Sequence, residues 1–329
     1  MQSFEGGAFA ADSDSDSLLA CPRCQGALIA LGCARCTIRY LAPDGIPDLR
    51  LDKDLRTERV RAFYKAAPFP GYPARDSLSG LRARAGRSAF AQLLDRSIEG
   101  DAVIAEVGCG TGQLSLYLAT ADRTVIGADL SRASLCLAQD AARRYGLSAV
   151  RFVETDLRAP GLRAGAFDVV ISSGVLHHTP DPRASFRALA RLARPGGVIV
   201  VGLYNTFARI PLRLRRAFRK LTGLIPFDPV LRDRRAEPER REAWLRDQYE
   251  HPEEHRHTLA EVQGWFRENA VEYLRAYPSP LLADAPPDNL FAPLEDDWPL
   301  ENLLAQLSWA RTLGHEGGLF IAVGRAQGA

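Results

Sequence analysis

The sequence predicts an α/β fold with an open, doubly wound sheet, preceded by a small cysteine-bound module. Three observations support this prediction. From about residue 88 onward, short apolar strands alternate with amphipathic helices, a pattern typical of a parallel sheet that helices cover on both faces. A glycine-rich turn, EVGCGTG at 106–112, follows the first of these strands, and two CxxC pairs stand at 21–36.

Composition limits the classes of protein that fit. The 329 residues allow one large domain with a small one, or two of middling size. Apolar residues at 46% and charged residues at 25% form an ordinary globular mixture. No apolar run is long enough to cross a membrane. Residues 1–17 contain neither a basic residue nor an apolar stretch, so we expect a disordered acidic tail, no secretory signal and a cytoplasmic protein.

The cysteines near the N-terminus have the spacing of a metal site. Cys21, Cys24, Cys33 and Cys36 form CxxC-x8-CxxC, and two such pairs supply the four thiolates that Zn²⁺ favours in tetrahedral coordination. This set leaves no ligand position open, so the Zn²⁺ predicted within 18–50 is structural. Disulfides are less favoured, because nothing in the sequence indicates export to an oxidising compartment.

The main domain is predicted over 88–329, after a linker with lid helices at 51–87. Predicted strands lie at 102–107, 124–128, 149–153, 167–173, 198–203, 271–277 and 318–323. Predicted helices lie at 88–97, 113–120, 132–145, 182–193, 258–269 and 300–313. The segment TLAE at 258–261 is a capping box that begins one of these helices. Residues 205–257 and 278–316 interrupt the alternation and are expected to be insertions.

The glycine turn predicts a nucleotide-like cofactor. Gly108, Gly110 and Gly112 permit a tight turn and a close approach of backbone to ligand, and the helix that follows presents free N–H groups. The dinucleotide fingerprint GxGxxG would need glycine at 113, where the sequence has glutamine. Asp129 ends the next strand, where a carboxylate can accept hydrogen bonds from two ribose hydroxyls.

Together these motifs resemble the class I S-adenosylmethionine (SAM) methyltransferases. Five further segments occur in the order of that family: VIGADLS, VETDL, FDVVISSGVLHH, LARPGGVIVVGLYN and GGLFIAVGR. The resemblance covers about 88–204 and 258–325, and it implies a seven-stranded Rossmann-like sheet whose last strand is antiparallel. The residues it implies for SAM binding are Glu106, Gly108, Cys109, Gly110, Gly112, Asp129, Leu130, Asp156, Leu157, Ser172, Ser173 and Gly174.

Plainer interpretations stand beside these assignments. The glycines could form an ordinary strand–helix turn, and Asp129 or Ser131 could cap the next helix. The resemblance implies an adenine contact for Asp156, which could equally be a common loop acid. Cys109 is interpreted as a small residue that fits the turn.

Two histidines and several aromatic residues are candidates for the acceptor side. His177 and His178 follow the fourth strand, and an imidazole there can take a proton from the acceptor; the alternative is that they shape the loop or cap the next helix. Phe69 and Tyr72 lie in FYKAAPFPGYP, where the family often has a lid, although this segment could simply dock a linker on the core. Tyr204 and Asn205 follow the fifth strand and are expected to edge the acceptor pocket.

The cysteine segment also resembles known zinc modules, and a second segment offers possible metal ligands. The CPRCQGAL and CARC segments resemble the zinc ribbon of small proteins that activate tRNA and protein methyltransferases, and the N-terminal knuckle of ribosomal-RNA guanine methyltransferases. A second cluster, EHPEEHRHT, offers His251, Glu254, His255 and His257. A solvated turn before the capping box explains this second cluster more simply than a metal does.

The acceptor is the least constrained prediction. The segment GVLHHTPDP and the aromatic lid favour a small organic molecule. RNA is the alternative, because residues 209–241 contain eleven Lys or Arg and four acids, a net charge of +7 in a chain of net charge +2. The leucines between those arginines also fit an amphipathic helix on the core, on a partner or at a membrane surface, and a solvated face is the plain alternative. A non-catalytic methyltransferase-like partner is disfavoured by the intact cofactor motifs.

Overall fold

The computed structural model describes residues 17–51, 76–121, 123–226, 228–233, 237–250, 254–281, 287–294, 298–313 and 317–328. Most of the predicted tail and of the predicted linker with its lid lies outside these ranges, and so do Phe69 and Tyr72. Within 51–87 the described part includes helix α3 (Leu78–Ala85).

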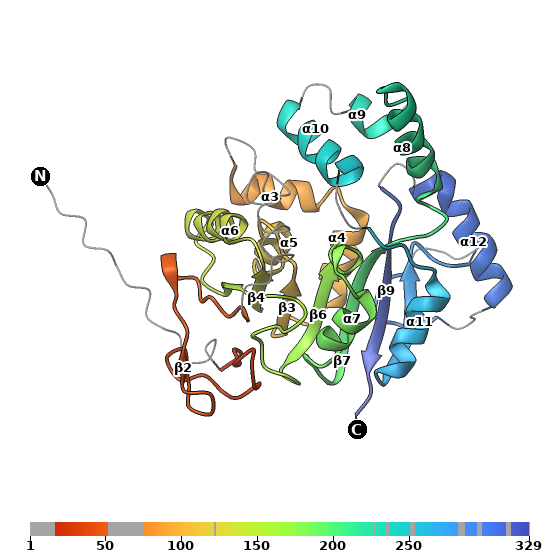
Figure 1. The fold of residues 1–329 in the computed structure, drawn as a ribbon. Coiled ribbons are helices and arrows are strands. Elements are labelled where there is room, and N and C mark those ends of the chain that lie inside the picture. The colour runs from red at the N-terminus through yellow and green to blue at the C-terminus, as the bar shows by residue number, and fades with distance from the viewer. Residues whose placement is uncertain are drawn as a thin grey trace, which may run out of the picture.

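The central sheet has seven strands, in the order β5-β4-β3-β6-β7-β9-β8 (Figure 1). The first five in this order run parallel, whereas β9 pairs antiparallel with both β7 and β8. The strands are β3 (Val103–Val107), β4 (Thr124–Asp129), β5 (Val150–Glu154), β6 (Phe167–Ser173), β7 (Ala193–Tyr204), β8 (Val271–Tyr277) and β9 (Leu319–Ala326). This confirms the predicted α/β sheet with its antiparallel last strand.

Two apolar cores lie on opposite faces of this sheet. Ile199 and Val201 belong to one core, and Val198 and Val200 to the other, because successive residues of a strand point to opposite faces. Helices α7, α11 and α12 contribute to the first core, and α4, α5 and α6 to the second. These helices are α4 (Ala89–Ser97), α5 (Gln113–Leu118), α6 (Arg132–Tyr145), α7 (Pro182–Ala190), α11 (Leu259–Glu268) and α12 (Pro299–Thr312).

Side-chain caps fix where several helices begin. Ser131 accepts a hydrogen bond from the N–H of Ser134 at the start of α6. Thr258 accepts one from the N–H of Glu261 at the start of α11, as the capping box predicts. These bonds satisfy backbone donors that the first turn of a helix leaves without a partner.

The region between α7 and β7 differs from the prediction. The helix predicted over 182–193 ends at Ala190, and Ala193 already pairs with Phe167 of β6. The next pair joins Val198 to Val169, so four residues of β7 lie opposite one residue of β6. The turn predicted at RPGG is therefore a bulge inside the strand, and Gly196 has a φ of 79° there, a value that favours glycine.

The cysteine module packs against the edge of the sheet formed by β5. It contains β1 (Gly32–Cys33), β2 (Ile38–Arg39) and the short helix η1 (Pro43–Gly45). The backbone N–H of Leu49 donates to the carbonyl of Glu154 at 2.8 Å, and the N–H of Glu154 donates to Pro47 at 2.9 Å. The chain after the cysteines thus continues the sheet beyond β5, and Leu49 is fully buried in the core beside it.

The first insertion forms α8 (Ile210–Thr222), α9 (Pro229–Asp233), α10 (Pro238–Leu245) and the π-helical turn η3 (Arg246–Glu250). They lie at the top of the molecule as drawn in Figure 1. Of the interpretations left open for these leucines, packing of an amphipathic helix on the core does not hold for most of α8. Leu212 is buried, but Leu214 and Leu221 are exposed, and Arg216 points inward to Glu254.

Candidate functional site

The carboxyl ends of β3, β4, β6 and β7 meet at one edge of the sheet. The chain order reverses here, because β4 and β5 extend to one side of β3 while β6 and β7 extend to the other. Such a switch point is the usual ligand site of an open α/β sheet. The glycine turn, Asp129, the histidines and Tyr204 all follow these strand ends.

The glycine turn is required by packing as well as by backbone conformation. Gly108, Gly110 and Gly112 have φ values of 84°, 54° and 72°. A Cβ at Gly108 would lie 2.2 Å from a methyl group of Val175, and one at Gly112 would lie 2.8 Å from the ring of Phe152. Bare backbone at these two positions therefore lets the turn approach other parts of the protein.

Two carboxylates hold the turn in place. Asp129 accepts a hydrogen bond from the N–H of Gly110 at 2.8 Å through one oxygen, and from the N–H of Ser131 at 2.7 Å through the other. Glu106 is buried and accepts a hydrogen bond from the hydroxyl of Ser115. Ser131, not Asp129, caps helix α6, so Asp129 is available to fix the turn.

Burial makes this pair of acids electrostatically unusual. It raises the pKa of Glu106 to about 7, although the hydrogen bonds from Ser115 oppose the rise. Burial also raises the pKa of Asp129, against the opposing hydrogen bonds from the backbone of Ser131, Gly110 and Leu130. Nearby negative charge adds to the rise at Glu106. A cation bound beside these acids would stabilise their ionised forms. Burial likewise raises the pKa of Cys109 well above its usual value, which fits a small packing residue.

The loop after β5 carries the predicted adenine contact. Asp156 is engaged with Arg158, whose Nη2 lies 2.6 Å from Oδ2 of the aspartate. Leu157 is buried and Leu130 is half-buried. The cysteine module holds this loop, because the N–H of Ala20 donates to Gly161 and the amide of Gln25 donates to Pro160.

The end of β6 contains one structural serine and an open glycine. The hydroxyl of Ser172 donates to the carbonyl of Val107 at 2.7 Å and is fully buried, so it links β6 to β3. Ser173 is half-buried. Gly174 has a φ of 79°, and a Cβ there would meet no described atom within 4 Å. Of these three positions, Gly174 is the one that leaves room beside the turn.

His177, His178 and Tyr204 form an aromatic cluster. The ring of His177 stacks on Tyr204 with centres 3.7 Å apart, and His178 meets both rings edge-on at 4.2 and 5.7 Å. His177 has no exposed surface, whereas His178 is 7% exposed. The phenol oxygen of Tyr204 accepts a hydrogen bond from Nε2 of Gln248 at 2.7 Å. The structure thus brings together the histidines and Tyr204, as expected, with His178 nearest the surface.

Asn205 serves the fold. Its side chain is fully buried, and its Oδ1 accepts hydrogen bonds from the N–H groups of Phe207 and Ala208. Its Nδ2 donates to Gln306 of α12 at 3.0 Å. These bonds occupy the amide, so the structure gives no support to Asn205 as an acceptor contact, in contrast to the sequence-based expectation.

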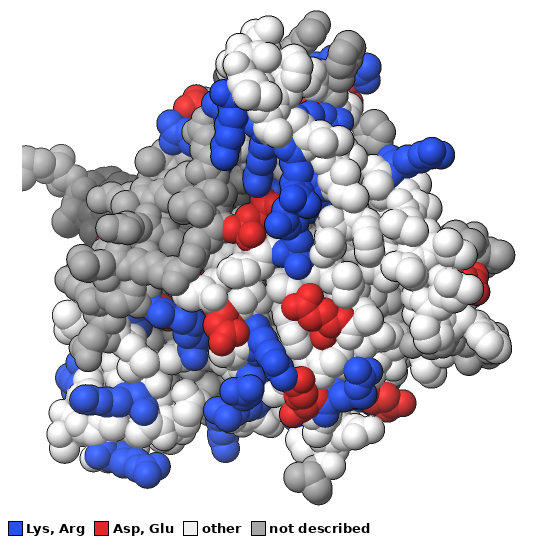
Figure 2. Space-filling view, turned by 45° about the vertical axis from the view of Figure 1, so that its right-hand side comes forward, with Lys and Arg blue, Asp and Glu red and all other residues white. Residues whose placement is uncertain are grey.

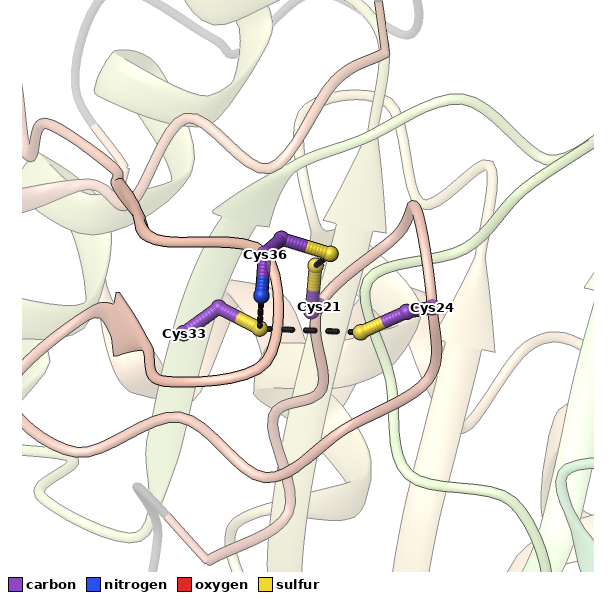
Figure 3. A group of neighbouring side chains, drawn as sticks. All are labelled: Cys21, Cys24, Cys33 and Cys36. Carbon is purple, nitrogen blue, oxygen red and sulfur yellow. Dashed lines mark hydrogen bonds between the residues drawn. The ribbon is translucent and has the colours of Figure 1, made fainter.

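The four cysteines converge as predicted (Figure 3). All four Sγ atoms lie within 4.8 Å of one another. The Sγ atoms of Cys24 and Cys33 are 3.6 Å apart, and those of Cys21 and Cys36 are 3.9 Å apart. In the part of the chain that the structure describes, this is the one such group of potential metal ligands.

The second histidine cluster does not converge on a metal site within the described residues. Glu254 pairs with Arg209 and Arg216. His257 pairs through Nδ1 with Glu261, 2.9 Å away. His251 lies outside the described ranges. The turn interpretation is therefore the better one for the described part of this segment.

Several residues of the site were missed by sequence reasoning. Ser115 lies in the helix that follows the glycine turn, nine residues after Glu106, which it contacts. The presence of a serine on that helix was the one sequence signal that could have indicated this contact. Arg209, Gln248 and Glu254 form a buried network beside Tyr204. No spacing in the sequence indicates it, because its members come from three separate segments.

Comparison with known proteins supports the same domain. Residues 105–201 match the family model described as a methyltransferase domain. An uncharacterized protein of Synechococcus sp. is 29% identical over 252 residues, which are 67% of this chain and 60% of that protein. The ubiquinone biosynthesis O-methyltransferase of Methylococcus capsulatus is 39% identical over 101 residues, which are 30% of this chain and 42% of the relative. The chain thus spans about half the length of these curated relatives.

Solved structures include magnesium protoporphyrin IX methyltransferase from Synechocystis PCC 6803 with bound SAH. It is 16% identical with a TM-score of 0.46, and the match covers 83% of this chain and all of that one. The family assignment rests on the domain match and on the strand order. On these two grounds, the chain carries a class I SAM-dependent methyltransferase domain, as its glycine motif predicts.

Proposed function

We propose that this chain transfers a methyl group from SAM to a small organic acceptor. The observation that carries the proposal is the meeting of Glu106, Asp129 and the glycine turn with the His178 and Tyr204 cluster at one edge of the sheet. The two acids and the glycine turn suit a cationic adenosyl ligand. The His178 and Tyr204 cluster suits the binding and deprotonation of an acceptor. Their strands, β3, β4, β6 and β7, are consecutive across the sheet.

The residues at the turn fit SAM. Both carboxylate oxygens of Asp129 accept backbone hydrogen bonds. Because a carboxylate offers about four lone pairs, it can still accept a hydrogen bond from a ribose hydroxyl. Buried Glu106 and half-buried Asp129 favour a positive ligand, and a Cβ at Gly174, just after β6, would meet no described atom within 4 Å. When bound, SAM supplies a methyl group already activated by its sulfonium. The protein's task is therefore alignment, which can contribute about 7–11 kcal/mol in favourable cases.

His178 is the proposed general base. It ends the short helix η2 (Leu176–His178), which follows β6, and of the two histidines it is the one with exposed surface. It would accept the proton that leaves the acceptor's oxygen or nitrogen as that atom takes the methyl group. Tyr204 would orient His178 through its ring, while Gln248 fixes the phenol oxygen.

The structure offers less to RNA than the composition suggests. Arg209 and Arg216, two of the eleven cations in 209–241, are directed to Glu254 inside the protein. Cations held in this way are not available to phosphates. This supports a small acceptor over RNA.

We also propose that the four cysteines hold a structural Zn²⁺. In a tetrahedral site with Zn–S bonds of about 2.3 Å, the sulfurs are about 3.8 Å apart. Two of the Sγ separations, 3.6 and 3.9 Å, fit this value. Metal analysis of the purified chain should find one zinc per molecule, and a Cys24→Ser variant should have lost it; zinc-free wild-type protein would contradict the assignment.

Calorimetry and labelled methyl transfer test the function. Titration with SAM and with its demethylated product should give saturable heat, and the absence of heat for both would overturn the cofactor assignment. Transfer of labelled methyl groups into a cell extract, fractionated into RNA, protein and metabolites, should label metabolites. Label confined to RNA or protein would overturn the small-molecule acceptor while leaving the cofactor assignment intact.

A further inference from the structure

Helix α8 presents its apolar residues to solvent. Ile210, Leu214, Phe218 and Leu221 are exposed and spaced by four, four and three residues, so they lie on one face of the helix. Leu214 is 67% and Leu221 is 86% exposed. An isolated exposed leucine is ordinary, but a complete helical stripe is not.

The opposite side of α8 faces the protein through arginines. Arg216 donates to the carbonyl of Gln248 at 2.7 Å and to Glu254 at 2.6 Å. The guanidinium of Arg219 lies 5.8 Å from the ring centre of Tyr249. Polar contacts of this kind hold the helix in an orientation that leaves its apolar stripe outside.

Helix α12 has a second exposed stripe. Leu300, Leu303, Leu304 and Leu307 are exposed at helical spacing, and Trp298 is exposed just before the helix. Counting those residues with Ile210, Leu214, Phe218, Leu221 and Leu224, these two segments hold ten of the fourteen large exposed apolar side chains in the described ranges. The concentration sets these two helices apart from the rest of the described surface.

The two helices belong to one side of the molecule. Arg209, at the start of α8, donates to the carbonyl of Gly317, just beyond α12. Figure 1 shows both helices at the right-hand side, and Figure 2, which turns that side forward, shows a broad white area beside a run of basic side chains. We refer to the exposed residues of 210–224 and 298–307 as the α8–α12 surface.

Charge indicates what covers this surface. Within 210–222 there are five cations and no acid, and Arg213 and Lys220 are exposed beside the apolar stripe. An apolar stripe bordered by cations is the pattern of a helix that lies in a membrane interface, with leucines among acyl chains and cations among anionic headgroups. The exposed Trp298, just before α12, suits the same interface. We propose that the α8–α12 surface docks on an anionic lipid bilayer.

The other occupants fit less well. A second copy in a twofold dimer would bring the same patch against itself, so the exposed Arg213 and Lys220 of each α8 would repel those of the other. RNA would satisfy Arg213 and Lys220 but would leave the leucine stripe in water. None of the helices in the described ranges has the length and hydropathy of a membrane-spanning segment, and the proposed contact is at the surface of the bilayer.

Docking on a bilayer would also affect the reaction; this consequence rests on the proposed function. β7 ends at Tyr204 and α8 begins at Ile210, so docking would bring the acceptor side of the site close to the bilayer. An acceptor dissolved in the membrane could then reach the site. The binding of vesicles can be tested without any methyl transfer.

Vesicle flotation tests the proposal with the 329-residue chain. Wild-type protein should float with phosphatidylcholine vesicles that contain phosphatidylglycerol, and much less with pure phosphatidylcholine. A Leu214→Ser/Leu221→Ser variant should bind about tenfold more weakly, because it removes two side chains from the acyl region. Arg213→Gln/Lys220→Gln should weaken binding to anionic vesicles by a similar factor. Its binding should also no longer depend on anionic lipid. Leu303→Ser/Leu307→Ser tests α12 separately and should also weaken binding.

The matched control is Ile29→Ser. Ile29 is 79% exposed but lies in the cysteine module, so its replacement should leave vesicle binding unchanged. Equal flotation of wild type and the leucine variants would overturn the proposal. So would a dimer that the leucine variants convert to monomer, or binding to an RNA oligonucleotide that wild-type protein prefers to anionic vesicles.

Discussion

The imidazole ring of His177 stacks on the phenol ring of Tyr204, with ring centres 3.7 Å apart and planes at 29°. The guanidinium carbon of Arg209 lies 3.7 Å from the same ring centre. Two groups so close to one ring centre must occupy opposite faces, since they would otherwise overlap. Arg209 in turn pairs with Glu254. The insertion 205–257 is thus joined through Tyr204 to the histidines that follow β6.

This arrangement assigns different roles to the two histidines. We expect His178→Gln to bind SAM with unchanged affinity but to lose about 10²–10⁴-fold in turnover, because it removes the proposed base. His177→Gln should instead lower the free energy of unfolding, since an aromatic stack contributes about 0.5–1.5 kcal/mol beyond burial. Calorimetry with SAM, single-turnover rates and urea unfolding measure the three quantities. Unchanged turnover in His178→Gln would remove it as the base.

The buried ion pair behind Tyr204 should dominate the stability of the insertion. Arg209 is fully buried, and Glu254 accepts its hydrogen bonds and those of Arg216. Burial alone would raise the pKa of Glu254, but the arginines hold it below its usual value. Glu254→Gln should cost about 3–5 kcal/mol in unfolding free energy, because it leaves a buried cation without its counter-ion.

A surface ion pair provides the control for Glu254→Gln. Arg183 and Glu268 also form an ion pair, but their side chains are 57% and 39% exposed. Glu268→Gln should therefore lower the unfolding free energy far less than Glu254→Gln does, because water and salt screen the exposed pair. Urea titration of the two variants at neutral pH gives both values, and equal losses would show that burial of the Arg209 pair contributes nothing extra.

The sequence predicted most of the fold because its signals are local. Strands β6 and β8 and helix α6 occur at their predicted residues, since each has an apolar pattern and a clear end. The sequence left the orientation of α8 open for the opposite reason. Its leucines and arginines fit two orientations equally well, and Glu254, more than thirty residues beyond Arg216, selects the one with arginines inside.

The candidate site was predictable to a similar extent. The motifs that follow strand ends predicted that Asp129, His178 and Tyr204 lie at one edge of the sheet, because parallel strands bring their carboxyl ends together there. The roles of single atoms were not predictable. Asn205 was expected beside the acceptor, but its amide is used by its own loop and by Gln306, contacts between segments far apart in the chain.

Asp129 should be central to SAM affinity. Both of its oxygens accept backbone hydrogen bonds, from Gly110 and Ser131. In Asp129→Asn, one of these N–H groups would face an amide NH₂ in place of an oxygen, and the proposed ribose contact would weaken. We expect SAM to bind about 10–100-fold more weakly, as measured by calorimetry. Asp140→Asn, at an exposed position of α6, should bind SAM as wild type does; equal affinities in both variants would contradict the role of Asp129.

Loss of the metal should also weaken SAM binding, through the loop after β5. The cysteine module holds that loop by hydrogen bonds to Gly161 and Pro160, and the loop begins beside Asp156. Cys24→Ser should therefore lose zinc and bind SAM about tenfold more weakly, a loss equivalent to one or two hydrogen bonds. Cys136→Ser, on α6, is the control and should keep both properties. Normal SAM affinity in zinc-free Cys24→Ser protein would show that the module and the cofactor site are independent.

Glu106 should make the stability of the ligand-free protein depend on pH. Its pKa rises from 4.5 to about 7 on folding because of burial. Between these values the folded state holds a proton that the unfolded state has lost, so the contribution of Glu106 to stability is complete below about pH 4.5 and declines as pH rises to about 7. Relative to wild type, Glu106→Gln should therefore gain up to about 3 kcal/mol of unfolding free energy over this range.

Urea unfolding between pH 4.5 and 8 measures the difference. Glu99→Gln, at an exposed position, is the control for removing one negative charge. If the difference in unfolding free energy between Glu106→Gln and wild type stays constant with pH, or falls as pH rises, Glu106 is ionised in the folded protein throughout this range. Its carboxylate would then already be charged before a cationic ligand binds.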